Sequence, residues 1–530
     1  MQVINLKSEI NGITILKNIT FSLNNNDKVG LVGPNGSGKS TLLKILASLL
    51  QSDSGVIKLD NETIGYLEQE IKKEYYDYTV IEYIKKSTGI KYLEDKLHEL
   101  EEDLNESNFD LYSEILNEFL AKDGYNFEDN LKLILNGLNF KENMDIKVSE
   151  LSGGEKIKVL LAILLLKNAD ILLLDEPTNN LDIASITWLE NYLKNANKKM
   201  IIVSHDEEFL NKIVNKIFEL NDGKIKEYNM RYMEYLEAKD NEYKREKQEY
   251  EDAKAQKEKL KKQLLKAQSW KDKGTSKKAH NDNDKIANNY ARERTNSKNI
   301  SKIADSIDKI NIPKFEEKED INFFFELDNS KGNKDIVLTE LVCGYEKFKT
   351  PPINLVIKYG SKVQIEGSNG SGKTTLIKTI LGDIFPQSGM VNIGSNVKIG
   401  YISQDTLSDN SEESIIDYIT KDIKEYDKSM LFTMLNKFGI NYEDKDKKYM
   451  TLSPGQRTRV NLVKLALNKI NVLILDEVTN HLDSDALNLI YELVNTYEGT
   501  IISVSHNRIY NELLNAKIVV NIDIGKITYK

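Results

Sequence analysis

Residues 29–46 read VGLVGPNGSGKSTLLKIL, in which an apolar run is followed by a glycine-rich stretch and then by strong helix formers. Glycines at these positions let the backbone wrap a phosphate with its N–H groups, and the following helix presents its positive end to the same phosphate. Lys39 is expected to reach the terminal phosphates, and the Ser40 hydroxyl to ligate Mg²⁺. The stretch therefore predicts an α/β fold in which a phosphate-binding loop, the P-loop, joins a buried strand to a helix.

The same pattern occurs a second time at residues 363–380, VQIEGSNGSGKTTLIKTI, where Lys373 and Thr374 take the places of Lys39 and Ser40. Four further pairs of motifs follow in the same order in each half: YLEQE and YISQD, LSGGEK and LSPGQR, ILLLDEPTNNLD and LILDEVTNHLD, IIVSHD and ISVSHN. We therefore expect two copies of one nucleotide-binding domain. The first copy has roughly thirty more residues between its second and third motifs, which predicts an insertion there.

A pair of carboxylates ends each apolar run of the fourth motif, as expected where a buried parallel strand presents acids at its carboxyl edge. Asp175 and Asp476 are expected to hold the magnesium ion, directly or through water. Glu176 and Glu477 are expected to orient and polarise the attacking water. Two glutamines could touch the ion and this water, and two histidines the terminal phosphate: Gln69, Gln404, His205 and His506. Each alone also fits an ordinary strand end or surface position, so order and repetition carry the interpretation.

Composition excludes several classes of protein. A chain of 530 residues with a net charge of -10 is too long for one core, and its apolar runs are shorter than the ~20 residues of a membrane-spanning helix. Residues 1–10 lack the pattern of a secretory signal. Cys343 is the only cysteine, which excludes disulfides and cysteine-rich metal sites within one chain. We expect a cytoplasmic protein.

In the kind and order of its motifs, over nearly the whole chain apart from a central connector, the sequence resembles the ATP-binding cassette (ABC) superfamily. The resemblance implies two cassettes packed head to tail, with each ATP between the Walker A motif of one cassette and the signature motif of the other. Site one would join Lys39 to residues 453–456, and site two would join Lys373 to residues 152–155. The implied D-loops contain Leu181 with Asp182 and Leu482 with Asp483.

The resemblance also assigns roles to single positions. The implied ATP contacts in the first half are Gly33, Pro34, Asn35, Gly36, Ser37, Gly38, Lys39, Ser40, Thr41, Gln69, Ser152, Gly153 and Gly154. Those in the second half are Gly367, Ser368, Asn369, Gly370, Ser371, Gly372, Lys373, Thr374, Thr375, Gln404, Ser453, Gly455 and Gln456, with Tyr345 stacking on adenine. The implied magnesium ligands are Ser40, Gln69, Asp175, Thr374, Gln404 and Asp476, and the implied catalytic residues are Glu176, Glu477, His205 and His506.

The two sites are expected to differ. Pro454 stands where the family has glycine, so one N–H is missing from the second signature. This loss could weaken site one by roughly 1–3 kcal/mol. It could also cost little, because a proline at a helix start removes only a spare N–H, and we favour this alternative slightly. Val478 replaces another usual proline, and the only aromatic before the first P-loop is Phe21, so an adenine-stacking candidate exists only in the second half.

The connector, residues 231–314, is nearly free of glycine and proline and shows leucine, tyrosine and isoleucine at heptad spacing. It predicts a long antiparallel two-helix coiled coil, with a first helix of about 35–40 residues or ~50–60 Å and a turn at residues 269–283. The expected domains are therefore residues 1–229, with a short helical arm-like insertion near 92–121, the linker 230–315, and residues 316–530.

The linker is locally basic, with about fifteen Lys or Arg against about five Asp or Glu between residues 254 and 302. Such a run suits contact with an RNA backbone, although a solvated helix face is the commoner explanation. The candidate RNA contacts are Trp270, Lys271, Lys273, Lys277, Lys278, His280, Arg292 and Arg294.

Tandem cassettes joined by a charged linker, without a membrane domain, resemble the ABC-F family. The resemblance implies ATP and Mg²⁺ as cofactors and the ribosome, its rRNA and tRNA near the exit site, as partner, with a monomer off the ribosome and no DNA. The long linker is similar to the antibiotic-resistance branch, whose tip displaces lincosamide, streptogramin A or pleuromutilin drugs. A housekeeping ABC-F translation factor is the alternative, and an ATPase subunit of a transporter or DNA-repair assembly is a third class.

Overall fold

The computed structural model describes all residues except 11, 35, 103–104, 106–107, 276–300, 303–305, 307–331, 346–347, 404–410, 422, 424–425, 441, 480–481 and 483. For residues 267–275, 454, 484 and 485 it describes the backbone but not the side chain. The chain divides into two compact units, Met1–Tyr232 with Ile321–Lys530, and Met233–Asp320. No helix among the described residues is both long and apolar enough to cross a membrane.

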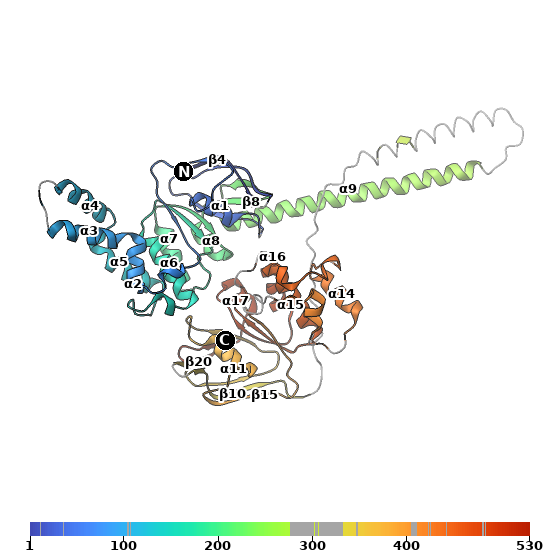
Figure 1. Ribbon diagram of the computed structural model, residues 1–530. Helices are drawn as coiled ribbons and strands as arrows, with labels where there is room; N and C mark the ends of the chain where they lie inside the picture. Colours follow the sequence, from blue (N-terminus) through green and yellow to red (C-terminus); the bar gives the residue numbers. More distant parts are fainter. Residues whose placement is uncertain are drawn as a thin grey trace, which may run out of the picture. The chain divides into compact units, whose positions relative to one another are not determined.

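In the first half of the larger unit, here the first cassette, a six-stranded sheet carries the P-loop (Figure 1). Its order is β5 (Ile64–Tyr66), β6 (Ile171–Asp175), β7 (Lys199–Val203), β3 (Lys28–Val32), β8 (Lys216–Asn221) and β9 (Lys224–Tyr228). All neighbours are parallel except β8 and β9. Every residue of β6 and β7 is buried, which explains their continuous apolar sequence. Polar groups at the carboxyl ends of β3, β5, β6 and β7 therefore meet at one edge.

The second cassette repeats this sheet. Its order is β16 (Ile399–Ser403), β17 (Val472–Asp476), β18 (Thr500–Val504), β14 (Lys362–Glu366), β19 (Ile518–Asn521) and β20 (Lys526–Tyr529). Each cassette adds an antiparallel three-stranded sheet: β2 (Ile13–Ser22), β1 (Gln2–Ile10) and β4 (Ser54–Lys58), or β13 (Ile353–Ile357), β10 (Ile336–Val342) and β15 (Ser388–Ile393). A short hairpin, β11 (Gly344–Tyr345) with β12 (Phe348–Lys349), belongs to the second cassette only within the described residues. The prediction of two α/β domains of one kind is confirmed.

Helices cover the sheets and build a helical part in each cassette. In the first they are α1 (Lys39–Leu46), α2 (Val80–Thr88), α3 (Ile90–Glu102), α4 (Phe109–Ala121), α5 (Phe127–Gly137), α6 (Gly153–Leu166), α7 (Ile183–Asn195) and α8 (Glu207–Ile213). In the second they are α11 (Lys373–Leu381), α13 (Ile415–Thr420), α14 (Lys428–Lys437), α15 (Pro454–Leu467), α16 (Ser484–Thr496) and α17 (Arg508–Leu514). The signature motifs begin α6 and α15 as capping boxes, since Ser152 pairs with Glu155 and Ser453 with Gln456.

The extra residues of the first cassette include α3 and α4, which lie side by side (Figure 1). Leu93 and Leu97 of α3 and Ile115 and Phe119 of α4 are buried, so these helices share a small apolar seam. They coincide with the expected helical insertion, and its function as an arm remains a prediction.

The smaller unit contains α9 (Tyr232–Thr275), a single helix of 44 residues (Figure 1). It is longer than expected, about 66 Å at 1.5 Å per residue. Residues 269–275, expected to begin the turn, are helical, because the chain has no glycine or proline between Tyr232 and Gly274. Ion pairs such as Lys244–Asp240 support this largely exposed helix. The expected return helix and the rest of the turn lie mostly outside the described residues, so the coiled coil remains a prediction.

Candidate nucleotide-binding sites

The first P-loop joins β3 to α1 in a conformation that needs glycine. Gly38 caps α1 with φ 100°, and a Cβ there would lie 2.5 Å from the side chain of Ile15. A Cβ on Gly33 would collide with the carbonyl of Leu220. Lys39 Nζ donates to the Gly33 and Pro34 carbonyls at 2.7 and 3.0 Å, inside the curve of the loop. The buried Ser37 Oγ has no hydrogen-bond partner, so the loop holds one unmatched hydroxyl beside a buried cation, as fits a phosphate site.

The acidic edge of the first cassette stands opposite this loop. Asp175, at the end of β6, takes hydrogen bonds from Ser40 and, at 3.2 Å, from Gln69 Nε2. Burial raises the pKa of Asp175, and the Ser40 hydroxyl opposes this shift. The structure thus brings all three expected magnesium ligands of the first half together beside a cavity of about 370 Å³ that Lys39 also lines.

Glu176 is held in a strained backbone conformation, with φ 52°. Its Oε2 accepts from the backbone N–H of His205 at 3.2 Å, and its Oε1 lies 3.5 Å from His205 Nε2. Burial raises the pKa of Glu176 to about 7, the His205 N–H opposes the shift, and the nearby Asp175 charge adds to it. A carboxylate with this pKa is well matched to polarise water near neutral pH.

The second cassette repeats the arrangement with different neighbours. Lys373 Nζ donates to the carbonyls of Gly367 and Ser368 at 3.0 and 3.1 Å, and Glu477 also has φ 52°. Asp476 takes hydrogen bonds from Thr374 and, at 3.4 Å, from the Tyr401 hydroxyl.

Unmatched polar atoms at this second site fit a nucleotide with a cation. Asp476 Oδ1, Ser371 Oγ and His506 Nε2 are buried without hydrogen-bond partners. His506 Nε2 lies 3.8 Å from Glu477, and burial, assisted by the Lys373 charge, lowers the pKa of His506 to about 4. A spare carboxylate oxygen suits a divalent cation, and a neutral imidazole can donate a hydrogen bond to a phosphate oxygen.

Site two is composite in the structure. Asn369 of the second P-loop donates to the carbonyl of Asn180, in the D-loop of the first cassette, at 2.6 Å. A Cβ on Gly154 of the first signature would lie 3.0 Å from that carbonyl oxygen and 3.2 Å from Asn369 Nδ2. The first signature, the first D-loop and the second P-loop therefore meet, as the head-to-tail pairing predicts.

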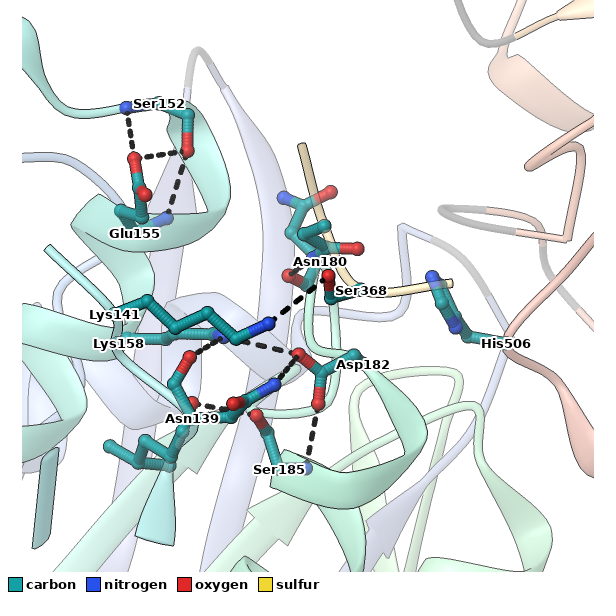
Figure 2. Close-up of polar contacts among 12 residues, drawn as sticks. Asn139, Lys141, Ser152, Glu155, Lys158, Asn180, Asp182, Ser185, Ser368 and His506 are labelled. Atoms are coloured by element: carbon teal, nitrogen blue, oxygen red, sulfur yellow. Dashed lines mark hydrogen bonds and ion pairs between the residues drawn. The ribbon is translucent and has the colours of Figure 1, made fainter. Parts of the chain in front are cut away.

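A buried polar network fixes the first D-loop at this meeting point (Figure 2). Lys158 of α6 pairs with Asp182 at 3.2 Å and also donates to the Asn139 carbonyl at 3.1 Å. Asp182 further accepts from Asn139 Nδ2 at 3.1 Å and from the Ser185 N–H at 2.8 Å. The network ties the signature helix, the start of α7 and the loop after α5 together.

Stacking of adenine on Tyr345 remains a prediction, and a second aromatic lies nearer the second P-loop. Tyr345 is 55% exposed on β11, whereas the ring of Phe348, its partner across the hairpin, lies 2.8 Å from a Cβ built on Gly372. Ile15 takes the equivalent place against the first P-loop. Phe21 is buried and packs on Phe218, ring centroids 5.0 Å apart, so it faces no ligand. We therefore assign Phe348, missed in the sequence because it follows Tyr345 so closely, as a second aromatic candidate.

Other residues of the motifs lie in the P-loops or in the first turns of helices. Gly36, Thr41, Gly370 and Thr375 lie in or directly after the P-loops, Gly153 and Gly455 in the first turns of α6 and α15, and Pro454 is the first residue of α15. Asn35, Gln404, Lys277, Lys278, His280, Arg292 and Arg294 lie outside the described residues, and Trp270, Lys271 and Lys273 lie on α9 where side chains are not described.

Some residues that the motifs do not reveal contribute to the junction of the cassettes. Arg508 of α17 pairs with Glu190 at 2.7 Å and Glu208 at 3.0 Å. Lys141 of the first cassette reaches the second P-loop, which Asp523 contacts from within its own cassette. Lys158 of the buried network has a sequence signal, because this charged residue stands directly before the apolar run VLLAILLL.

A family model described as ABC transporter matches residues 16–179 and 351–480. The putative ATP-binding protein YdiF of Bacillus subtilis (strain 168) is 33% identical over 96% of this chain and 78% of the relative. The probable ATP-binding protein YbiT of Escherichia coli O157:H7 is 31% identical over 97% and 94%. ABC transporter F family member 2 of Arabidopsis thaliana is 29% identical over 99% and 77%.

Among solved structures, the archaeal ribosome recycling factor aABCE1, in complex with the ribosomal stalk protein aP1, is similar with a TM-score of 0.59. The match covers 98% of this chain and 87% of that chain at 18% identity. At this identity the likeness establishes the fold alone.

Proposed function

The chain belongs to the ABC-F family of tandem ATP-binding cassette proteins and is an ATPase, and we propose that it acts on the ribosome, near the tRNA exit site, as a translation factor. The observation that carries the proposal is the composite site two, where the signature and D-loop of one cassette reach the P-loop of the other within a single chain. Binding of ATP there would hold the cassettes together, and hydrolysis would release them. The basic helical linker supplies a surface suited to RNA.

In the proposed reaction, Lys39 and Lys373 bind the terminal phosphates. Glu176 and Glu477 orient the attacking water. A magnesium ion held by Asp175 with Ser40, or by Asp476 with Thr374, would neutralise phosphate charge.

The relatives support the housekeeping alternative better than the resistance role expected from the linker. Those described above are named as ATP-binding or ABC-F proteins, and none of these names mentions a drug. The second test below therefore also measures whether the linker tip displaces a drug.

The first test replaces Glu176 and Glu477 together by glutamine. The variant should bind ATP without turnover, because an amide polarises water poorly, and should pellet with ribosomes when ATP is present. A Lys39→Ala, Lys373→Ala variant is the control that should not pellet in an ATP-dependent way. Rapid release of the double glutamine variant from ribosomes in ATP would refute the proposal.

The second test expresses the protein in a susceptible bacterium and measures inhibitory concentrations for ribosomal antibiotics. A translation factor should leave them unchanged, both in wild type and after residues 269–283 are shortened. A rise that the shortening abolishes, with ATP turnover kept within a few-fold, would instead establish the resistance role.

A further inference from the structure

A carboxylate is fixed to the second residue of the second P-loop. Its second residue is Ser368, where the first P-loop has Pro34. The backbone N–H and the hydroxyl of Ser368 both donate to Asp523, each at 2.8 Å. Asp523 lies in the turn between β19 and β20, which has four residues where the turn between β8 and β9 has two. The longer turn thus places the carboxylate of Asp523 on the rim of the second phosphate site.

A cation from the other cassette faces this rim. Lys141, in the loop after α5, places its Nζ 3.4 Å from the Ser368 hydroxyl (Figure 2). The same loop is anchored two residues earlier, where Asn139 joins the buried Lys158–Asp182 pair. The ammonium therefore projects from a fixed base toward the second P-loop.

The space between these groups can accept a ligand. A cavity of about 260 Å³ is lined by Lys141 and Asp182 from the first cassette and by Gly367, Ser368 and Asp523 from the second. His506, whose buried Nε2 has no hydrogen-bond partner, also lines it. Lys158 already compensates Asp182, so Lys141 faces the carboxylates of Asp523 and Glu366 across this cavity.

The equivalent rim of the first P-loop is built differently. A cavity of about 40 Å³ beside Gly33 and His205 is lined from the second cassette by Leu487, Asn488 and Tyr491, which carry no charge. By sequence, the position equivalent to Lys141 is Asn441. At this position the first cassette has a lysine and the second an asparagine.

We propose that Lys141 is a ligand, from the first cassette, for the terminal phosphate of the nucleotide in the second P-loop. In the absence of nucleotide the ammonium lies at the Ser368 hydroxyl beside Asp523. When a triphosphate occupies the loop, the ammonium moves to a phosphate oxygen and offsets the repulsion from Asp523. The first cassette thereby distinguishes ATP from ADP at site two. This inference rests on the proposed binding of ATP by the second P-loop.

The experiment measures the affinity of the full chain for fluorescent ATP and ADP analogues, one site at a time. Lys39→Ala leaves site two to be measured, and Lys373→Ala leaves site one. In the first background, Lys141→Gln should weaken ATP binding about tenfold and ADP binding less than about twofold, as expected for one lost charge-assisted hydrogen bond. In the Lys373→Ala background, which reports on site one, Lys141→Gln should change neither the ATP affinity nor the ADP affinity.

Two further variants sharpen the result. Asp523→Asn should raise the ATP affinity of site two severalfold, because it removes a negative charge from the rim. Lys147→Gln is the control: it changes an exposed lysine of the same loop and should leave the ATP affinity of site two unchanged.

Equal loss of ATP and ADP affinity, equal loss at both sites, or no loss would overturn the role of Lys141. If the Lys39→Ala protein fails to bind ATP before Lys141 is changed, the nucleotide role of the second P-loop itself is refuted.

Discussion

Replacing Lys158 by methionine should destabilise the first cassette by about 3 kcal/mol. Lys158 is 4% exposed, and its ammonium contacts Asp182 and the Asn139 carbonyl at 3.2 and 3.1 Å. Methionine keeps most of the apolar stem, so the change removes the cation and leaves the Asp182 carboxylate buried. Breaking such a pair costs about 3–5 kcal/mol. We expect the lower end, because Asp182 keeps the hydrogen bonds from Ser185 and Asn139.

Urea denaturation of the full chain, followed by tryptophan fluorescence, measures this change. Trp188 lies on α7, close after Asp182, and the only other tryptophan is Trp270, so a Trp270→Phe background isolates the signal of the first cassette. The loss follows from the midpoint shift and the slope. Lys167→Met, an exposed lysine at the end of α6, is the control and should cost less than about 0.5 kcal/mol.

Adding Asp182→Asn to Lys158→Met removes the uncompensated buried charge and should restore at least half of the lost stability, since both members of the pair are then neutral. A loss below about 1 kcal/mol for Lys158→Met, or a double variant as unstable as the sum of the single ones, would refute the reasoning.

Three further outcomes are expected. Pro454→Gly should leave ATP turnover within about twofold of wild type, because an N–H at the first position of a helix has no acceptor within that helix. A larger rise in turnover that Glu176→Gln abolishes would contradict this prediction. Gly154→Ala should lower turnover more than Gly153→Ala, because only the Gly154 Cβ meets the D-loop of its own cassette and the second P-loop; steady-state ATPase rates decide between them. Burial alone would raise the pKa of Asp182, but its hydrogen bonds and the nearby Lys158 ammonium together lower this pKa below 3.8. The ionised carboxylate therefore stabilises the fold fully above about pH 4, and this stabilisation is lost as pH falls through the lowered pKa. The gap in melting temperature between wild type and Asp182→Asn should therefore narrow below pH 4, and a gap independent of pH would exclude this linkage.

The motifs could be predicted from a single sequence because each depends on the chemistry of a few consecutive residues. Gly38 needs a positive φ, the apolar strands β6 and β17 need burial, and Ser152 with Glu155 forms a capping box, each within a few consecutive residues. The sequence therefore determined the two P-loops, the acidic edges, the repeated α/β domain and the presence of a long linker helix.

Longer-range features required the tertiary structure. The end of α9 was misjudged because helix propagation through residues 269–275 depends on the sum of weak propensities rather than on one breaking residue. The closeness of the Phe348 ring to the second P-loop depends on the pairing of two two-residue strands, which only the structure shows.

The sequence by itself determined what each site is made of, because phosphate cradles and acidic strand ends are built from neighbours along the chain. Only the tertiary structure decided how the sites differ. Asp523 and Lys141 lie 155 and 227 positions from Ser368, and no local pattern links them to a P-loop. Their meeting depends on a two-residue difference in a turn and on the packing of one cassette against the other, and such contacts are set by the whole fold rather than by any segment.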